Sequence, residues 1–437
     1  MIYNRFKNKG SPYFGYIPID WNVLELGELG YFKNGINFPR SAYGKGVAII
    51  NVKNLYNGRY VDLESLNEIK KESIKKYKDY LVNEGDILFA RSSLVNSGAA
   101  QASMVHFQKM QETVYSGFII RFRLNTERRI VQEFLNYLLR SKAYRAYLPK
   151  ILASTAITNI SQETLKKLPI ITPPFLEQKA IAKILSDLDS KIELNQKMNK
   201  TLEAIAQAIF KHWFIDFEFP NEEGKPYKSS GGEMVDSELG EIPKGWKIGY
   251  LGDLLNIRRE HCDPSQETRT LPYVPIDCIS KKSLMLTDHK PGEEARSSLI
   301  KFHKFDIIFG AMRPYFHKVC IAPFEGTTRT TAFVFYPKDL NDYAFLVLTV
   351  FSERTIKYAN LNSTGSTIPY AAWENSLETM PIVIPFTAVR HNFNKIIANM
   401  LISIGEYLPN QIVTLKNILD SLVPRLMTGK IRVPLEE

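Results

Sequence analysis

The sequence is poor in the features that mark disulfide-bonded, metal-bound or membrane proteins. Cys262, Cys278 and Cys320 are its only cysteines among 437 residues, and none forms a CxxC pair. This pattern excludes a disulfide framework and a cysteine-based zinc site, and it favours a reducing compartment. The start of the chain lacks the apolar run of a signal peptide, and no later segment reaches the roughly 18 apolar residues of a membrane span. We therefore expect a cytoplasmic protein with no membrane partner.

Signatures of catalysis are also missing. The sequence has no GxxxxGK[ST] nucleotide loop, no GxGxxG motif after a predicted strand, and neither HExxH nor GxSxG. Its seven histidines are dispersed without metal-ligand spacing. Asp62, Glu68 and Lys70 weakly resemble a nuclease set, but such trios are common in charged chains. A fused methyltransferase or nuclease is thus the disfavoured alternative, and we expect no catalytic residue, metal ion or cofactor in this chain.

The residues that are present indicate two folded domains and an anionic partner. A length of 437 residues exceeds what one hydrophobic core usually organises. Hydrophobic residues at 44% and aromatic residues at 12% supply material for packed cores. The excess of 56 Lys and Arg over 46 Asp and Glu gives a formal charge of +10, which favours a polyanion such as nucleic acid.

An internal repeat divides the chain into two halves. IPIDWNVLELGEL at 17–29 resembles IPKGWKIGYLGDL at 242–254, with the spacing of the shared Ile, Pro, Trp, Leu and Gly residues retained. Further on, EGDILFARSS at 84–93 corresponds to KFDIIFGAMRP at 304–314, and LPIITPP at 168–174 corresponds to MPIVIPF at 380–386. The apolar runs after Asp86 and Asp306 are of β type, and each is expected to lead into a loop.

Each half ends in a predicted long helix. From Leu176 to Trp213 the chain has no Pro or Gly, and apolar residues recur with the 3 and 4 spacing of a coiled coil. The predicted packing residues of this helix are Leu185, Leu188, Ile192, Asn195, Leu202, Ile205 and Ile209. Those of the second helix are Leu401, Ile404, Leu408, Ile412, Leu415, Ile418 and Leu422, with a kink expected at Pro409 and an end at Pro424 and Gly429. Asn195 and Asn199 lie on the first stripe, where they either fix the register of a buried seam or face solvent.

Basic, small polar and aromatic residues gather in loops of both halves, where recognition residues are usually found. The candidates for DNA contact in the first half are Lys33, Arg40, Ser41, Arg91, Ser92, Ser93, Thr155, Thr158 and Asn159. Those in the second half are Arg258, Arg259, Arg313, Tyr315, His317, Lys318, Ser363, Thr364, Ser366 and Thr367. Arginine suits guanine edges or phosphates, and Asn, Ser and Thr suit adenine edges or backbone oxygens. A surface ion pair is the alternative for each arginine.

Together these motifs resemble the specificity subunits of type I restriction-modification systems. The resemblance covers nearly the whole chain and rests on the IPxxW opening of each half, on GDILFARS and DIIFGAMRPYFHK, on STAITNISQETLKKLPIITPP, on LEQKAIAKILSDLDSKIELN, and on LVPRLMTGKIRV near the C-terminus. The second long helix departs from the pattern because it opens with VRHNFNKIIANM. This departure puts its contacts with partner proteins in doubt.

The resemblance implies an α+β fold with an internal pseudo-two-fold repeat. Two globular, mostly β target-recognition domains would be separated by two long helices that form an antiparallel coiled-coil spacer. The expected boundaries are 1–175 and 241–387 for the two domains, 176–218 for the first spacer helix, 219–240 for a connector, and 388–430 for the second spacer helix and the C-terminal tail. A helix of about 38 residues spans roughly 57 Å, so its length would set the distance between the two readers.

The resemblance also implies a non-catalytic subunit that binds a bipartite, asymmetric site on double-stranded DNA. Two modification subunits with S-adenosylmethionine would methylate adenine there, and restriction subunits with ATP and Mg would act on unmodified DNA. This chain would bind none of these cofactors itself. The alternative is a coiled-coil scaffold or decoy that binds modification subunits without sequence-selective DNA binding.

Overall fold

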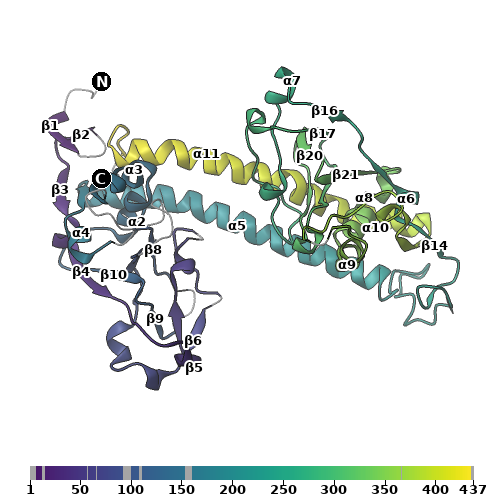
Figure 1. The fold of residues 1–437 in the computed structure, drawn as a ribbon, viewed down its shortest axis with the longest axis horizontal. Coiled ribbons are helices and arrows are strands. Elements are labelled where there is room, and N and C mark those ends of the chain that lie inside the picture. Colours follow the sequence, from purple (N-terminus) through teal and green to yellow (C-terminus); the bar gives the residue numbers. More distant parts are fainter. Residues whose placement is uncertain are drawn as a thin grey trace. The chain divides into compact units, whose positions relative to one another are not determined.

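The chain folds into two compact units. The computed structural model describes residues 6–11, 15–56, 58–64, 66–91, 100–107, 111–152, 160–365 and 367–434. Unit 1 consists of Met1–Ser190 and Asn417–Glu437, and unit 2 of Lys191–Lys416. Each unit therefore combines one half of the repeat with segments of both long helices (Figure 1). None of the described helices is long and apolar enough to cross a membrane.

Unit 1 is a mixture of small sheets and short helices. Its four-stranded sheet consists of β4 (Gly30–Asn34), β10 (Ile119–Leu124), β7 (Ile87–Ala90) and β8 (Ala102–Met104), in that order. A three-stranded sheet has the order β6 (Asn67–Ile69), β5 (Tyr43–Ile50) and β9 (Thr113–Tyr115). Two antiparallel pairs join β1 (Phe6–Ser11) to β2 (Gly15–Pro18), and β3 (Asn22–Glu25) to the distant β11 (Pro169–Thr172). The short helices are α1 (Leu26–Leu29), α2 (Gln132–Arg140), α3 (Lys142–Leu152) and α4 (Gln162–Lys166).

Unit 2 contains the corresponding elements. Its four-stranded sheet consists of β15 (Leu255–Ile257), β21 (Ala332–Pro337), β18 (Ile307–Gly310) and β19 (Val319–Ile321), in that order. A three-stranded sheet has the order β16 (His261–Cys262), β17 (Leu299–Phe302) and β20 (Gly326–Arg329). The pairs are β12 (Met234–Val235) with β13 (Ile242–Pro243), and β14 (Lys247–Tyr250) with β22 (Pro381–Ile384). The short helices are α6 (Leu251–Leu254), α7 (Gln266–Arg269), α8 (Tyr343–Phe351) and α9 (Glu353–Leu361).

The four-stranded sheets repeat one topology, whereas the three-stranded sheets do not. Strand β4 corresponds to β15, β10 to β21, β7 to β18 and β8 to β19, and every pairing in both sheets is antiparallel. The apolar runs predicted after Asp86 and Asp306 are β7 and β18, whose residues are all buried. In the other sheets, β5 pairs parallel with β9 in unit 1, while all pairings are antiparallel in unit 2. The two halves thus share a frame and differ in the elements added to it.

The repeated LGEL and LGDL segments form the single-turn helices α1 and α6. In α1 the backbone N–H of Glu25 donates to Oε1 of Glu28 at 2.7 Å, which closes a capping box that α6 also has. A Cβ placed on Gly27 would lie 2.9 Å from the Cβ of Lys166, and one on Gly252 would lie 2.7 Å from a neighbouring side-chain carbon. The two glycines recur because each turn packs too closely against its neighbour for a larger residue.

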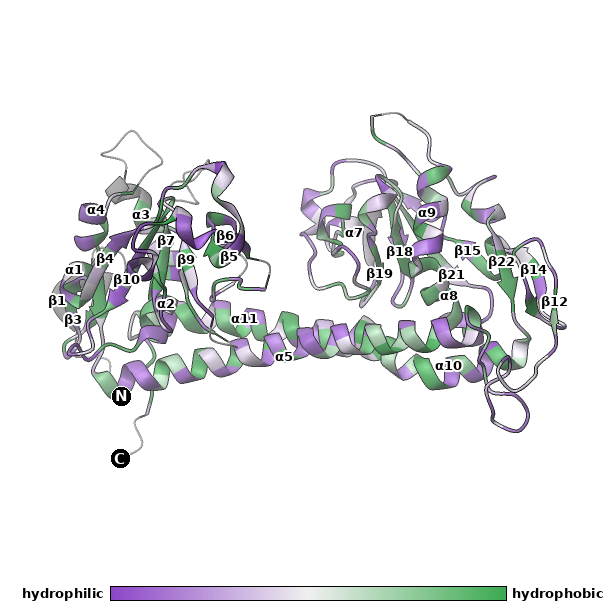
Figure 2. Ribbon diagram, turned by 90° about the horizontal axis from the view of Figure 1, so that it is seen from below, coloured by the Kyte–Doolittle hydropathy of each residue, from purple (hydrophilic) through white to green (hydrophobic). Residues whose placement is uncertain are grey.

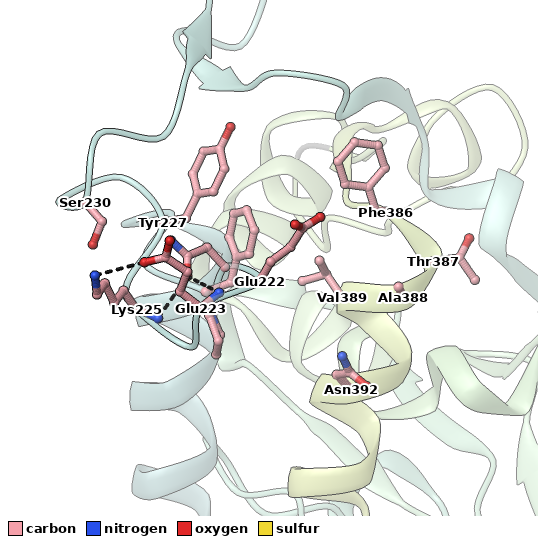
Figure 3. A pocket seen from close by; sticks show the side chains of 13 residues that line it. Glu222, Glu223, Lys225, Tyr227, Ser230, Phe386, Thr387, Ala388, Val389 and Asn392 are labelled. Atoms are coloured by element: carbon pink, nitrogen blue, oxygen red, sulfur yellow. Dashed lines mark hydrogen bonds and ion pairs between the residues drawn. The ribbon is translucent and has the colours of Figure 1, made fainter.

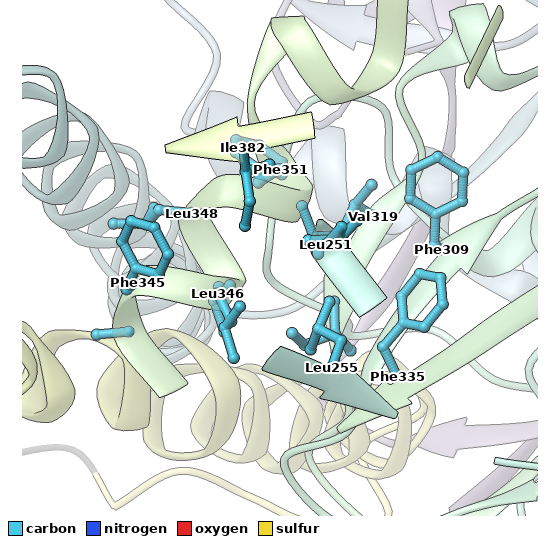
Figure 4. Packing of buried hydrophobic residues seen from close by; sticks show 14 of the residues in the cluster. Leu251, Leu255, Phe309, Val319, Phe335, Phe345, Leu346, Leu348, Phe351 and Ile382 are labelled. Atoms are coloured by element: carbon cyan, nitrogen blue, oxygen red, sulfur yellow. The ribbon is translucent and has the colours of Figure 1, made fainter. Parts of the chain in front are cut away.

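The apolar packing of unit 2 connects the sheet to the helices (Figure 4). Leu251 and Leu255 lie beside Val319, Phe309 and Phe335 from strands β19, β18 and β21, and all five side chains are buried. Helix α8 has the sequence YAFLVLTVF and every residue from its second position onward is buried. A helix that is apolar on all sides must be covered on all sides, so α8 lies between the sheet and the long helices.

Both predicted long helices are present. Helix α5 (Phe175–Phe214) is continuous for 40 residues and ends before Phe217, whose φ of +62° lies in the left-handed region. The second begins as α10 (Thr387–Ile402), passes through a π-helical turn (Ser403–Tyr407), and continues as α11 (Leu408–Met427). A kink is expected at Pro409, and the structure has a π-helical turn that ends two residues before this proline. The helix also continues three residues beyond Pro424, and Gly429 with a φ of +67° follows its end.

Burial along the helices follows the predicted stripe with two exceptions, and hydrophobic and hydrophilic residues alternate along α5 and α11 in Figure 2. Leu185, Ile192, Asn195, Leu401, Ile404, Leu408 and Ile412 are buried, and Leu188, Leu202, Ile209, Leu415 and Leu422 are half-buried. The expectation fails at Ile205 and Ile418, each 39% exposed. Ala206 and Leu419 pack in their place, because a strict heptad step from Ile192 and Ile412 falls on the residue after each predicted one.

Asn195 and Asn199 are buried, so the solvent-facing alternative does not hold. The amide of Asn195 donates to Oε1 of Gln411 at 3.0 Å, which joins α5 to α11 within unit 2. The amide of Asn199 donates to Oε1 of Glu203 at 2.9 Å on the same helix. Of these two bonds only that of Asn195 crosses to the second helix, so it is the one that a slip between the helices would break.

The segment 219–240, expected as a connector, packs onto unit 2. Its Phe219 ring stacks on Trp246 with centroids 4.8 Å apart and on Tyr227 at 4.6 Å. Strand β12 then pairs with β13. The aromatic residues anchor this segment despite its Gly, Ser and Pro content, so it belongs to the fold of unit 2.

The two repeated tryptophans have different surroundings. Trp21 donates its indole N–H to Oε2 of Glu177 at 3.0 Å, and Arg432 pairs with the same carboxylate at 2.6 Å. Trp246 is also buried, but its indole nitrogen has no hydrogen-bond partner within the part of the chain that is described. In the aligned repeat Val389 takes the position of Glu177. The repeat therefore conserves the ring and replaces its polar contact with aromatic stacking.

Candidate nucleic-acid interface

Two candidate loops of unit 2 lie side by side. The backbone N–H of Arg313 donates to the carbonyl of Pro369 at 2.7 Å, and that of Ala371 donates to Ala311 at 2.9 Å. An isolated β-bridge also joins Met312 to Tyr370. The loop that follows β18 and the loop that follows α9 therefore form one composite surface. The sequence predicted both loops, and the hydrogen bonds bring them together.

The loop after β18 is held in an unusual backbone conformation. Arg313 and His317 have φ values of +53° and +52°, on either side of a short turn at Pro314–Phe316. A left-handed conformation costs a non-glycine residue about 1 kcal/mol, so the surrounding contacts must impose it. The Nε of Arg313 is buried and has no hydrogen-bond partner among the described residues. Because this nitrogen is enclosed by the fold, it is not the atom that would meet DNA; the residue as a whole is half-buried, and its left-handed backbone sets where the guanidinium starts.

His317 shapes this loop and is not available for DNA contact, which corrects the sequence-based expectation. Only 4% of the residue is exposed. Its Nε2 lies 2.8 Å from the carbonyl of Phe351, and its own carbonyl accepts the N–H of Lys282 at 2.8 Å. Burial lowers the pKa of His317 below its ordinary value of 6.5. We therefore assign His317 to loop positioning.

Next to His317, the remaining side chains of the loop have distinct roles. Tyr315 is 49% exposed, and its ring lies 4.7 Å from that of Phe316. The ammonium of Lys281 lies over the Phe316 ring, 4.2 Å from its centroid. Lys281 therefore belongs to this surface, although it was not among the residues predicted from the sequence. Lys318 donates to the carbonyl of Ile276 at 2.7 Å and holds the base of the loop. Tyr315 is therefore the side chain best displayed for stacking or backbone contact.

The loop after α9 is displayed at the same surface. Thr364 pairs with Tyr370 through both backbone hydrogen bonds, at 2.9 and 2.8 Å, and Thr364 and Thr367 are exposed. The hydroxyl of Ser363 instead donates to the carbonyl of Ala359 at 2.6 Å and closes the end of the helix. Ser366 lies outside the described residues.

Arg258 and Arg259 are neighbours in sequence but differ in environment. The guanidinium of Arg258 forms a two-point ion pair with Asp306, at 2.7 and 3.1 Å, and stacks over the Tyr336 ring at 4.2 Å. This geometry gives Arg258 a structural role in place of the expected DNA contact. Arg259 pairs with Glu374 at 2.8 Å, and both side chains are largely exposed. An exposed pair is weak, so Arg259 can exchange its carboxylate for a phosphate.

Unit 1 positions Arg91 through the same backbone connections that position Ala311 in unit 2. The N–H of Arg91 donates to Phe118 at 2.9 Å, and its carbonyl accepts from Ile160 at 2.8 Å. In unit 2 the corresponding bonds hold Ala311. Arg91 and Arg313 are therefore not equivalent, although both follow the repeated strand. Ser92, Ser93, Thr155, Thr158 and Asn159 lie outside the described residues.

The other candidates of unit 1 divide into one structural residue and two exposed ones. Lys33 donates to the carbonyl of Asp79 at 2.9 Å and lies over the Tyr80 ring at 4.5 Å, so its charge is used within the fold. Arg40 and Ser41 are exposed at the start of β5. Phe118, which the sequence analysis missed, is 62% exposed beside Arg91. Its signal in the sequence was a bulky aromatic residue in the turn that enters β10.

A large cavity lies elsewhere in unit 2 (Figure 3). It has a volume of about 1270 Å³ and is lined by the segment 219–230 and the start of α10. Glu222 and Glu223 lie at this cavity, and Lys225 is paired with Glu223 at 2.9 Å. Two carboxylates against one paired ammonium repel phosphate, so this cavity is not part of the candidate interface. Among the described residues no group of three or more His, Cys, Asp or Glu side chains is placed to hold a metal ion.

The repeated frame with divergent, polar loops defines a two-domain DNA-recognition protein. The family described as type I restriction modification DNA specificity domain matches residues 18–204 and 243–412. The chain belongs to this family of type I restriction-modification specificity subunits.

Individual relatives agree with this assignment. The chain is 28% identical over 439 residues to the type I restriction enzyme MjaIX specificity subunit of Methanocaldococcus jannaschii, which covers 96% of this chain and 95% of the relative. It is 30% identical over 203 residues to the HindI specificity subunit of Haemophilus influenzae, covering 46% of this chain and 42% of that one. The crystal structure of the type I S subunit from M. genitalium shares the fold, with a TM-score of 0.57, 14% identity, and coverage of 93% and 96% of the two chains.

Proposed function

We propose that each unit of this specificity subunit reads one half of a bipartite, asymmetric DNA site. The observation that carries the proposal is the matching set of backbone hydrogen bonds at the C-terminal end of strands β7 and β18, made by Arg91 in unit 1 and by Ala311 in unit 2. The same frame presents different side chains, so two unlike half-sites are expected. The formal charge of +10 favours approach to the phosphate backbone.

We propose further that the repeated frame and helices serve the partner proteins. Two similar surfaces on one chain would dock two modification subunits, which would carry S-adenosylmethionine and methylate adenine. ATP- and Mg-dependent restriction subunits would join the same complex. In this scheme the chain supplies no catalytic group and no cofactor, and it works in the cytoplasm, where the DNA lies.

The scaffold or decoy alternative is disfavoured. It would use the helices alone and would place no constraint on the loops after β18 and α9. The ordered contacts of these loops, with Arg313 and His317 both held in the left-handed conformation, support a ligand-binding role instead. Membership of a DNA specificity family supports the same choice.

The test is methylation mapping with exchanged loops. The chain is expressed with its modification subunit in a host without other methylases, and genomic methylation is mapped at single-base resolution. Replacing the loop after β18 and the loop after α9 in unit 2 with those of a relative should change one half of the motif and leave the other half intact. An assembled complex that methylates no motif would support the scaffold alternative and overturn the proposal.

A further inference from the structure

Both units connect their recognition domain to helix α5 through a buried polar cluster. The first cluster consists of Arg59, Tyr137 and Asp189 in unit 1, and the second of Asn199, Glu203 and Ser283 in unit 2. We call them the first and second helix clamps. We infer that these clamps fix the angle of each reader on the helix and so determine which spacer length between the half-sites is accepted. The inference rests on the proposed function.

The first helix clamp joins three parts of unit 1. Arg59 donates to the hydroxyl of Tyr137 at 2.7 Å, and this hydroxyl donates to Oδ2 of Asp189 on α5 at 2.5 Å. Arg59 also reaches Oγ of Ser190 at 3.2 Å. Its backbone carbonyl accepts from the amide of Asn136 on α2 at 3.0 Å. The arginine thus has its main chain in the recognition domain and its guanidinium on the helix.

Burial strengthens the first helix clamp. The side chain of Arg59 is 10% exposed and that of Asp189 is 25% exposed. Burial and the neighbouring Asp189 raise the pKa of Tyr137, so its hydroxyl stays protonated and remains a donor. Charge-assisted hydrogen bonds in such a shielded site are directional as well as strong.

The second helix clamp makes the same kind of connection with other residues. Oε1 of Glu203 on α5 accepts from Asn199 at 2.9 Å, from the Ser283 hydroxyl at 2.9 Å and from the N–H of Leu284 at 2.8 Å. The carbonyl of Leu284 accepts from Ile321 in β19 at 2.8 Å. The loop around Ser283 is therefore bonded to the recognition sheet on one side and to α5 on the other. Glu203 is only 5% exposed, and burial raises its pKa.

Apolar packing alone would not fix these angles. The helices also contact their recognition domains through side chains such as Leu185 in unit 1 and Ala206 in unit 2. Such contacts are non-directional and tolerate small rotations at little cost. Three hydrogen bonds to one carboxylate oxygen tolerate far less, because each bond weakens as its angle changes. A reader fixed at one angle reaches its half-site only when the DNA spacer presents that half-site at the matching rotation.

The experiment measures spacer tolerance. After the wild-type motif is known, a plasmid library presents the two half-sites at the native spacing and at spacings one or two base pairs shorter and longer. The methylated fraction is measured at each spacing for the complete complex. For Glu203→Ala and for Tyr137→Phe, we expect the preference for the native spacing to fall about tenfold, as for loss of a buried hydrogen-bond partner. The base preference within each half-site should stay as in the wild type.

Conservative and matched variants separate positioning from stability. Glu203→Gln keeps an oxygen that can accept the bonds from Asn199, Ser283 and Leu284. It should retain the wild-type spacing preference. Gln207→Ala changes an exposed position of the same helix and should have no effect. If Glu203→Ala does not fold, Ser283→Ala removes one donor and should broaden the spacing in the same direction.

Two results would overturn the inference. One is a wild-type spacing profile in folded Glu203→Ala and Tyr137→Phe complexes. The other is an equally broad profile for Glu203→Gln and Glu203→Ala, since the gained amide would then not substitute for the carboxylate. Failure of the proposed function is distinguishable, because the wild-type complex itself would then show no bipartite motif.

Discussion

The ion pair between Asp306 and Arg258 gives the sharpest test of the structure against the sequence-based expectation. The structure makes Arg258 a stabilising residue, whereas the sequence analysis placed it among the DNA contacts. The side chain of Asp306 is 4% exposed and that of Arg258 is 22% exposed. Oδ2 of Asp306 also accepts the backbone N–H of His303 at 2.7 Å, which closes the turn before β18.

Asp306→Ala should destabilise unit 2 by about 2–3 kcal/mol. Removing one partner of a fully buried ion pair costs about 3–5 kcal/mol, and the partial exposure of Arg258 lowers this figure through solvent screening. The matched control is Glu233→Ala, which breaks the ion pair with Lys244 at the same 2.7 Å distance but with side chains 63% and 62% exposed. This control should not change stability measurably.

Urea unfolding followed by tryptophan fluorescence measures the difference, because three of the four tryptophans lie in unit 2. Arg258→Met keeps an unbranched apolar stem without the guanidinium and should also destabilise, while the double variant should cost less than the sum of the single ones. Equal shifts for Asp306→Ala and Glu233→Ala would refute the reasoning. Unchanged stability of Arg258→Met together with lost discrimination at one half-site would restore the DNA-contact interpretation.

Four further predictions follow from the same contacts. Trp21→Phe should destabilise by about 1–3 kcal/mol more than Trp246→Phe in thermal unfolding, because only the first leaves a buried carboxylate without its indole donor. The pKa of His317 is lowered in the folded state, so its contribution to stability is complete above pH 6.5 and decreases as the pH falls through the folded-state pKa. The free energy of unfolding of His317→Gln should therefore depend less on pH in that range. Arg313→Ala should weaken recognition at one half-site by about 1–3 kcal/mol in competition binding. Insertion of one heptad into each spacer helix should lengthen the accepted DNA spacer in methylation mapping.

Specific outcomes would contradict each of these predictions. Equal losses for the two tryptophan variants would mean that the indole hydrogen bond adds nothing. If the stability of His317→Gln varied with pH just as that of the wild type does, protonation of His317 would not be the cause of the pH dependence. Uniformly weaker binding of Arg313→Ala to unrelated sequences would assign it to phosphate contact, and an unchanged spacer after the insertion would end the idea that helix length measures DNA.

The sequence predicted the parts of the fold that depend on local patterns. The long helices, the apolar strands after Asp86 and Asp306, and the repeat that relates the halves all follow from the order of apolar and polar residues. The same patterns failed where a shift of one residue decides whether a helix position is buried or exposed. Ile205 and Ile418 are exposed because the heptad step from Ile192 and from Ile412 falls one residue later, on Ala206 and Leu419, and an apolar residue beside the stripe is easily mistaken for a member of it.

The roles of the basic residues could not be predicted from local patterns. Arg258 depends on Asp306, which lies 48 residues away, and Lys33 depends on a carbonyl 46 residues away. His317 depends on Phe351, which is 34 residues away. A loop composition is the same whether its cations face solvent or a distant partner, so only tertiary structure separates the two cases. Composition identified the loops, and long-range contacts assigned their members.

Comparison of the two halves shows where the frame constrains sequence. Gln178 at the start of α5 donates to Pro173 at 2.8 Å and accepts from the N–H of Val131 at 2.9 Å. Its counterpart Arg390 donates to the carbonyl of Pro385 at 2.5 Å and pairs with Asp342. Both side chains fasten the start of a long helix to the segment before an equivalent short helix, with an amide in one half and an ion pair in the other.

This substitution explains why the departure of VRHNFNKIIANM from the first-half pattern does not disturb the second long helix. The connection is retained although the residue types differ, so the frame is under stronger constraint than any single pair within it. The loops around Arg91 and Ala311 are under the opposite condition, because their backbone bonds are kept while their side chains change. New DNA specificity should therefore arise from exchange of these loops on an unchanged frame. Gln178→Arg should instead cost stability, because no acidic partner is introduced for the new arginine in the way that Asp342 serves Arg390.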